Sequence, residues 1–267
     1  MTKQEAAIKY ITENYLDYNR LRHDIVADKM QVRCAHNLGE EAKGDEASRQ
    51  EYWREMTKHD INSIVCHCAQ EYDANITSRE VMTALQSDLI PQVHPLREYV
   101  LSCGEWTEEE PDWIDFVARQ VTVKPLGDEA KGDKARGEGL WRGCFKKWFV
   151  AMVASWMKDE VVNHQVLVLI GKQGIFKTTW LEHLIPPHLR AYACKLANSN
   201  DLNKDERLRI AEFGLISLDE IDSMNNRELN QLKSVITATD VNERAAYAYT
   251  KERRVRLASF CASGNRR

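Results

Sequence analysis

The stretch from Val166 to Trp180 constrains the fold of this chain more than any other. It reads V-L-V-L-I-G-K-Q-G-I-F-K-T-T-W, an apolar, β-branched run that stops at Gly171 and leads through a second glycine into residues that can open a helix. A strand, a glycine-containing loop and a helix in this order can form a concavity of backbone N–H groups that binds phosphate. The stretch therefore predicts an α/β fold with a phosphate loop. The alternative interpretation is a buried strand that ends in an ordinary glycine-rich turn.

The loop carries the side chains that a nucleoside triphosphate and Mg²⁺ require. Lys177 can reach the terminal phosphates, and the Thr178 hydroxyl can bind the metal. One position departs from the pattern G-x-x-x-x-G-K-[ST], because Phe176 stands where the second glycine is expected. If this position has a positive φ, the phenylalanine is strained, and we expect its ring to pack beside the loop. The predicted nucleotide-binding residues are Gly171, Gly174, Ile175, Phe176, Lys177, Thr178 and Thr179.

A second predicted strand ends in two acids. The segment from Phe213 to Asp222 reads F-G-L-I-S-L-D-E-I-D, which places Asp219 and Glu220 at the carboxyl end of an apolar run. In P-loop ATPases the first acid holds Mg²⁺ and the second polarises the attacking water. We therefore predict that Asp219 joins Thr178 at the metal and that Glu220 is catalytic. Taken alone, two acids after a strand are also common on protein surfaces.

A third predicted strand, from Val255 to Ala262, is followed by Ser263-Gly264-Asn265. Such a strand can present a polar amide to the γ-phosphate and the water, and Asn265 is the candidate for this role. The alternative is a turn, because a Gly-Asn pair often marks one. Together, the loop, the acids and the amide predict a site that binds and hydrolyses ATP with Mg²⁺.

Several motifs together resemble the virulence-associated protein E family, P-loop ATPases of phages and mobile genetic elements that are similar to superfamily 3 helicases within the AAA+ class. The resemblance covers residues 140–265 well and Asp60–Trp113 more loosely. The motifs that carry it are G-K-Q-G-I-F-K-T-T-W-L, L-D-E-I-D-S-M, E-L-N-Q-L-K-S-V-I-T, E-R-A-A-Y-A-Y and A-S-F-C-A-S-G-N. The last of these places Asn265 at the position of the family's sensor residue.

The resemblance implies an enzyme that hydrolyses ATP and acts on DNA, with helicase-like activity in the replication of a phage or mobile element. In superfamily 3 relatives the segment before the sensor strand forms a hairpin that touches DNA, single-stranded or forked, in a central channel. This implies a homo-oligomer that can close into a ring, and DNA contacts from Lys251, Arg253 and Arg254. It also suggests Arg244 as a residue that acts on phosphates or on a neighbouring subunit's nucleotide.

The charge distribution agrees with a DNA-binding C-terminal half. The net charge is −4, but residues 140–267 hold 20 Lys and Arg against 14 Asp and Glu, whereas residues 1–139 hold 17 against 27. A local basic patch matters more for binding DNA phosphates than the net charge does. Arg256 extends the basic run after Lys251 and is included in the predicted nucleic-acid set. The alternative is a solvated charged face.

The chain divides into three predicted parts: a mainly helical accessory region (1–126), a flexible linker (127–139) and the ATPase domain (140–267). The linker prediction rests on the polar segment after Gly127, which nearly repeats the one after Gly39. Helices are predicted for Met1–Tyr15, Asp60–Glu71 and the segment from the Thr77 capping box through Leu85. The last two helices could read DNA as a helix-turn-helix, but they are more typical of a packed pair.

A long helix from Leu140 to Val161 opens the predicted ATPase domain. Its aromatic residues recur at helical spacing, which favours packing against the sheet over the alternative of stacking on nucleobases. They are Trp141, Phe145, Trp148, Phe149 and Trp156.

The remaining features indicate a cytoplasmic protein. No run of 18 apolar residues occurs, and the first residues lack an apolar signal region, so no membrane association is expected. The seven cysteines are scattered, and Cys66 and Cys68 lie one residue apart in a predicted helix, which favours free thiols over a zinc site. A superfamily 3-like domain is expected to continue past Asn265, so the ATPase domain is predicted to be truncated. Two further interpretations stay open: an inactive fragment, and a nucleotide-dependent switch or defence-associated binding module without helicase activity.

Overall fold

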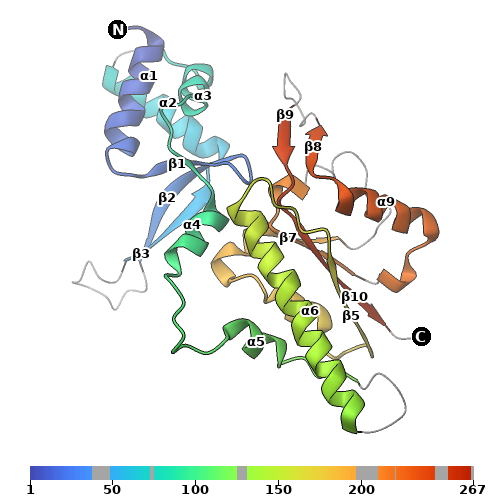
Figure 1. The fold of residues 1–267 in the computed structure, drawn as a ribbon. Helices are drawn as coiled ribbons and strands as arrows, with labels where there is room; N and C mark the ends of the chain where they lie inside the picture. The colour runs from blue at the N-terminus through green and yellow to red at the C-terminus, as the bar shows by residue number, and fades with distance from the viewer. Residues whose placement is uncertain are drawn as a thin grey trace. The chain divides into compact units, whose positions relative to one another are not determined.

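The computed structural model describes residues 1–37, 49–72, 75–124, 131–196, 210–219, 221–243 and 252–265 (Figure 1). The chain forms two compact units, Met1–Pro95 and Leu96–Arg267, and each is considered by itself. Within the described part of the chain, no helix combines the length and the apolar character needed to cross a bilayer.

Three helices form one layer of the first unit. Helix α1 (Lys3–Ile11) begins with a capping box of Thr2 and Glu5 and continues into a π-helical turn, η1 (Thr12–Leu16). Helix α2 (Lys58–Tyr72) is followed by α3 (Ser78–Leu85), whose first turn is closed by the predicted capping box of Thr77 and Glu80. All three helices share one core. Helices α2 and α3 thus pack together, as the sequence favours, and α1 packs against both. The fully buried side chains of this core include Ala6, Ala7, Ile64, Cys68, Val81 and Leu85.

The first unit also contains a four-stranded sheet, which the prediction of a mainly helical region did not include. The strand order is β3-β2-β1-β4, with β1 antiparallel to β2, β2 antiparallel to β3, and β1 parallel to β4. The strands are β1 (Leu21–Asp24), β2 (Lys29–Asn37), β3 (Arg49–Glu55) and β4 (Gln92–Val93). Strand β3 reads R-Q-E-Y-W-R-E and lacks the apolar alternation by which a strand is recognised, because it is the edge strand of the sheet.

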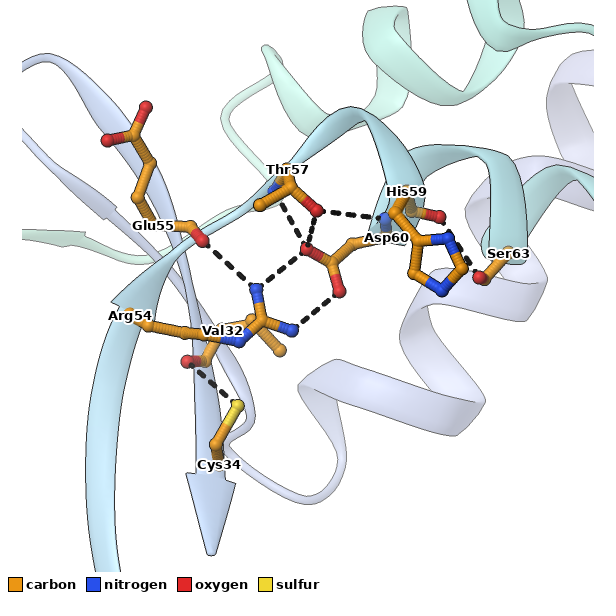
Figure 2. Close-up of polar contacts among 8 residues, drawn as sticks. All are labelled: Val32, Cys34, Arg54, Glu55, Thr57, His59, Asp60 and Ser63. Carbon is orange, nitrogen blue, oxygen red and sulfur yellow. Dashed lines mark hydrogen bonds and ion pairs between the residues drawn. The ribbon is translucent and has the colours of Figure 1, made fainter.

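A clamp between β3 and α2 fixes the start of the helix (Figure 2). The Arg54 guanidinium donates two hydrogen bonds to the Asp60 carboxylate, with N–O distances of 2.7 and 2.6 Å. The backbone N–H and the hydroxyl of Thr57 donate to the same carboxylate, both at 2.7 Å. Arg54, followed by Thr57, holds the pKa of Asp60 well below its usual range because each hydrogen bond favours the charged carboxylate.

Substituting Asp60 with asparagine is expected to lower the free energy of unfolding by about 1 kcal/mol near neutral pH, since the ion pair with Arg54 is lost and the neutral amide accepts weaker hydrogen bonds from Thr57. The carboxylate has a lower pKa in the folded than in the unfolded chain, so its stabilisation is complete above the unfolded value of about 4. That stabilisation is lost as the pH falls through this value toward the folded pKa. Urea denaturation at about pH 7 and about pH 2.5 measures the free energy of unfolding of the wild type and the variant. We expect the difference between the two proteins to be smaller at about pH 2.5.

Asp88→Asn provides the matched control, because Asp88 belongs to the same unit and is exposed. It is expected to change stability by less than about 0.5 kcal/mol at either pH. Equal effects of the two substitutions, or a D60N effect that stays constant into acid, would show that the clamp does not stabilise the unit.

The helices of the second unit include a long α6, which runs from Lys131 to Met157. Residues 131–139 are thus helical, whereas the sequence predicted a flexible linker over 127–139; residues 127–130 lie outside the described part. The other helical segments are α4 (Pro95–Ser102), which starts at the boundary between the units, α5 (Trp113–Ala118), α7 (Lys177–Glu182), η3 (Pro187–Tyr192), η5 (Ile221–Ser223) and α9 (Asn226–Thr237). The sequence from Asn203 to Phe213 also predicts an amphipathic helix, and most of this segment lies outside the described residues.

The aromatic side chains of α6 pack in the core, as predicted. Phe145, Trp148 and Trp156 are buried. The Trp148 indole N–H donates to the backbone carbonyl of Phe260 at 3.0 Å, and that of Trp156 donates to the carbonyl of Gly214 at 3.2 Å. These bonds satisfy the polar atom of each ring inside the core and attach α6 to the strands of the sheet.

A parallel four-stranded sheet is the centre of the second unit (Figure 1). Its strands are β5 (Val166–Gly171), β6 (Ala193–Leu196), β7 (Leu215–Leu218) and β10 (Ser259–Asn265), in the order β5-β10-β7-β6. The predicted mixed α/β fold with a parallel sheet is therefore confirmed. A separate antiparallel pair, β8 (Asp240–Glu243) and β9 (Glu252–Val255), precedes β10 along the chain.

Alternation along β7 and β10 directs one set of apolar side chains toward α9 and leaves polar residues among apolar ones on the other face. Ile216, Leu218, Phe260 and Ala262 are buried in a cluster with Leu232, Val235 and Ile236 of α9. Because successive side chains in a strand point to opposite faces, the intervening residues of β7 and β10 lie on the other face. That face carries Ser217, Cys261 and Ser263, and it leads to Asp219 at the end of β7.

Candidate phosphate and metal site

The predicted phosphate loop connects β5 to α7. Gly174 has φ +81°, and a side chain there would meet nothing within 4 Å, so the loop backbone is open on that side. Phe176 has φ +60° and ψ +25°, the left-handed conformation that glycine adopts without strain. The sequence pattern expects glycine for this reason. The Phe176 residue is 76% exposed, so its ring lies in solvent at the site instead of packing beside the loop.

Lys177, the first residue of α7, reaches back across the loop. Its ammonium donates to the carbonyls of Gly171 at 3.0 Å and Lys172 at 2.8 Å, and to the Asn265 side-chain oxygen at 3.2 Å. The first bonds close the loop onto the end of β5. The third joins the loop to the end of β10, so the predicted lysine and the predicted amide lie together.

The sheet register explains this meeting. Strand β10 lies between β5 and β7, with Asn265 opposite Gly171 on one side and Ala262 opposite Leu218 on the other. The carboxyl ends of parallel strands share one edge of the sheet, where ligands of α/β proteins usually bind. The phosphate loop, Asn265 and the acid after β7 are therefore neighbours although they are far apart in the sequence.

Three oxygen-bearing side chains converge at this edge. The Ser263 hydroxyl donates to Asp219 Oδ1 at 2.8 Å, and the Thr178 hydroxyl donates to the same oxygen at 3.2 Å. The two hydroxyl oxygens are 3.0 Å apart. Thr178 and Asp219 are the predicted metal ligands, whereas the prediction missed Ser263. Its position two residues before Asn265 on the same strand places both on one face, and this was the available signal.

A lysine completes the surroundings of Asp219. The Lys195 ammonium, on β6, lies 2.9 Å from Asp219 Oδ2. Lys195, and to a lesser degree the Ser263 and Thr178 hydroxyls, lowers the pKa of Asp219, and Asp219 in turn raises the pKa of Lys195. Each oxygen of the carboxylate thus has its own partners. Lys195 was not among the predicted site residues, because a lone lysine on a short strand carries no sequence signal.

These groups line one cavity of about 310 Å³. Its walls are the loop and the start of α7 on one side and the ends of β7 and β10 on the other; the lining residues are Gln173, Gly174, Ile175, Phe176, Lys177, Thr178, Thr179, Asp219, Ser263, Gly264 and Asn265. Gly264 packs closely against Asp222, because a Cβ at its position would lie 3.1 Å from Asp222 Oδ1. Asp222 also accepts the backbone N–H of Asn265 at 3.1 Å and so fixes the end of β10.

The donors in this cavity match a phosphate group and a hard divalent cation. None of the described residues accepts a hydrogen bond from the backbone N–H of Gly174 or Ile175, and the first N–H groups of a helix also lack intrahelical partners. Carboxylate and hydroxyl oxygens suit Mg²⁺, which binds through one or two carboxylates together with phosphate and water. Among the described residues, no group of three His, Cys, Asp or Glu side chains could hold a metal ion by itself. Cys68 is buried and Cys66 is exposed, so their thiols lie on different sides of α2.

Not every predicted site residue can be placed. Glu220, Arg244 and Lys251 lie outside the described residues. Arg253 belongs to β9, but only its backbone is described. The Arg254 side chain is 18% exposed and lies 3.5 Å from Glu212, so this predicted DNA-binding residue is at least partly engaged within the protein.

The assignment of Arg256 to the nucleic-acid set is wrong, because its side chain is completely buried. The guanidinium donates to the carbonyls of Ile236, Ala238, Ala258 and Asn163. Burial lowers its pKa to about 10. Arg256 therefore joins the end of α9 to the start of β10 inside the core. Sequence reasoning counted it with its basic neighbours, because it cannot tell which member of a charged run turns inward.

Comparisons with known proteins place the C-terminal half in a family. A family model described as the virulence-associated protein E-like domain matches residues 134–267. No curated protein sequence matches the chain.

Solved structures titled as apo forms of the NrS-1 C terminal region are similar to the chain. One of them is 14% identical, with a TM-score of 0.44, and the match covers 94% of this chain and 55% of that one. A second, of residues 305–718, is 13% identical, with a TM-score of 0.45, and the match covers 98% of this chain and 57% of that one. The chain thus spans little more than half the length of the structures it matches.

Proposed function

The chain belongs to the virulence-associated protein E-like domain family, and from this premise we propose that it is a Mg²⁺-dependent P-loop ATPase that acts on DNA. The observation that carries the proposal is the cavity in which the loop, Lys177, Thr178, Asp219, Ser263 and Asn265 come together. Asp219, Ser263 and Asn265 come from the ends of β7 and β10, and Lys177 and Thr178 open the helix that follows the neighbouring strand β5. A solvent-exposed turn after β5 would not require a lysine, a threonine and an acid to converge in this way.

The loop and Lys177 would hold the triphosphate. Residues Gly174 to Thr179 line the cavity. The Lys177 ammonium can exchange its carbonyl partners for phosphate oxygens, which bind it more strongly because they are charged. Asn265 would keep its amide beside this ammonium, next to the terminal phosphate. Catalysis at such sites consists mostly of positioning and of charge stabilisation.

Thr178, Asp219 and Ser263 would hold Mg²⁺. When bound, the metal supplies positive charge that offsets the negative charge on the transferred phosphoryl group. Ser263 holds the Asp219 carboxylate toward Thr178, so the oxygens are already close together. Glu220 follows Asp219 directly in the sequence and remains the proposed residue for activating the attacking water.

The β8–β9 pair supports DNA as the substrate. It is a two-stranded antiparallel element directly before β10, the strand that carries Ser263 and Asn265. Its second strand contains Arg253 and Arg254, and the connection between its strands contains Arg244 and Lys251. Three residues separate the end of this pair from β10, the strand that contributes to the proposed ATP site. Replication of a phage or mobile element, and assembly into a ring, are the parts of the proposal that rest on the family alone.

ATP hydrolysis with and without single-stranded DNA, together with strand separation on a forked duplex, tests this proposal. We expect DNA to raise the rate of ATP hydrolysis and the forked duplex to be separated in the presence of ATP and Mg²⁺. ATP binding that is indifferent to DNA, without strand separation, would instead support a nucleotide-dependent switch. Absence of any ATP binding would remove both functions.

A further inference from the structure

The Lys195–Asp219 ion pair joins a residue of the proposed nucleotide cavity to a residue of a second cavity. Asp219 lines the first cavity, whereas Lys195 lines the second, which has a volume of about 270 Å³. Its lining includes Ser217, Glu182 and Arg190, from β7, α7 and η3. Lys195 and Ser217 are paired in the sheet register, so their side chains lie on the same face of the sheet as Asp219.

The ion pair conflicts with metal binding at Asp219. Lys195 lies 2.9 Å from Asp219 Oδ2, while Thr178 and Ser263 contact Oδ1. A divalent cation at this carboxylate would lie close to the ammonium, and two positive groups at such a distance repel each other. Binding of the cation therefore requires the ammonium either to stay at a cost in affinity or to move away.

The second cavity offers the ammonium another position. The Lys195 side chain is 46% exposed, and a lysine has a flexible four-carbon stem, so it can change rotamer without disturbing the core. Glu182 is the one acid among the described residues that line this cavity, and it already contributes to raising the pKa of Lys195. Arg190 and His183 line the same cavity and add no negative charge there, which leaves Glu182 as the group that can receive the ammonium.

We propose that Lys195 is a movable counter-ion of the metal site, which neutralises Asp219 while the site is empty and turns toward Glu182 when a divalent cation binds. This inference rests on the proposed function, because it assumes that Asp219 holds the cation. Lys195 is thus a positioning residue and not a ligand. If Lys195 acts in this way, the nucleotide-free protein binds free Mg²⁺ weakly, and the cation enters mainly together with the triphosphate.

Binding of Mn²⁺ without nucleotide, followed by the electron paramagnetic resonance signal of the free ion, tests the inference in the full chain. Lys195→Met is expected to bind Mn²⁺ about fivefold more tightly than the wild type, since one repulsive charge is removed. Lys195→Arg keeps the charge and is expected to match the wild type. Glu182→Gln is expected to bind Mn²⁺ about twofold more weakly, because the ammonium loses its second partner.

Two further measurements separate electrostatics from altered folding. The gain in the Lys195→Met variant is expected to shrink at high ionic strength, which a structural effect would not do. Lys195→Gln provides a second neutral variant should the methionine variant fold poorly, and thermal melting identifies such a case. Equal or weaker Mn²⁺ binding by both folded neutral variants would overturn the inference.

Asp219→Asn distinguishes this inference from the proposed function. If Asp219 holds the cation, D219N loses Mn²⁺ binding, and adding Lys195→Met to D219N produces no gain. If D219N binds Mn²⁺ as the wild type does, the metal site itself is wrongly assigned. Loss of binding in D219N with no gain in Lys195→Met leaves the metal site in place and refutes only the role of Lys195.

Discussion

Lys177→Ala is expected to reduce ATP hydrolysis at least about 100-fold, because it removes the charged donor that stabilises the terminal phosphates. In the nucleotide-free protein the ammonium bonds to the carbonyls of Gly171 and Lys172 and to Asn265, all at the edge of the sheet. None of these bonds lies in the hydrophobic core, so the fold should persist. Phosphate release at saturating ATP and Mg²⁺ measures the activity, and circular dichroism measures the fold.

Lys172→Ala is the matched control for this substitution. Lys172 carries the same charge in the same loop, is exposed, and contributes its backbone carbonyl to Lys177. Its side chain is not among the groups that line the cavity. We expect its ATPase rate to stay within about twofold of the wild type, as for most exposed side chains outside a site. Equal losses in the two variants would mean that the loop needs positive charge in general and not Lys177 in particular.

Asp219→Asn is expected to reduce Mg²⁺-dependent hydrolysis by about 100- to 1000-fold, in the range found when a charge-stabilising group is removed from an active site. The amide keeps the shape of the side chain but cannot offer a negative charge to the metal. Titration with Mg²⁺ should not restore the wild-type rate. The effect on stability should be small, because the Lys195 partner is 46% exposed and exposed ion pairs contribute little.

Asp159→Asn serves as the control in the same unit. Asp159 is 72% exposed and forms its ion pair with Arg97. Its variant should hydrolyse ATP at the wild-type rate with the same Mg²⁺ dependence. Wild-type turnover by Asp219→Asn at saturating Mg²⁺ would be incompatible with a metal held at this carboxylate.

The positions that sequence predicted well are those where several independent signals agree. One apolar strand is followed, at fixed spacing, by the glycines, Lys177 and Thr178. Asp219 stands directly after a second apolar strand, and Asn265 stands at the end of a third. The order of these elements along the chain is enough to expect a parallel sheet with its site at the carboxyl edge. The structure places Lys177, Thr178, Asp219 and Asn265 around one cavity, which agrees with this expectation.

The residues that sequence missed depend on neighbours in space. Lys195 becomes part of the site only because β6 lies beside β7, and Ser263 only because β10 lies between β5 and β7. Arg256 shows the reverse error, because sequence assigned it to the site and the structure does not. It stands in a basic run, but its side chain is buried in the core between α9 and β10. Strand β3 was missed because an edge strand can be rich in charge. Contacts between distant segments decide the cases of Lys195, Arg256 and β3, and the local sequence pattern does not contain them.

Binding of ATP with Mg²⁺, measured by isothermal titration calorimetry, tests the central claim most directly, because it asks whether the cavity holds a triphosphate before any catalysis is considered. The wild type and Lys172→Ala should bind one nucleotide per chain with similar affinity, and Lys177→Ala should bind at least about tenfold more weakly. Failure of the folded wild type to bind ATP, or equal affinities of wild type and Lys177→Ala, would contradict the assignment of this cavity as the nucleotide site.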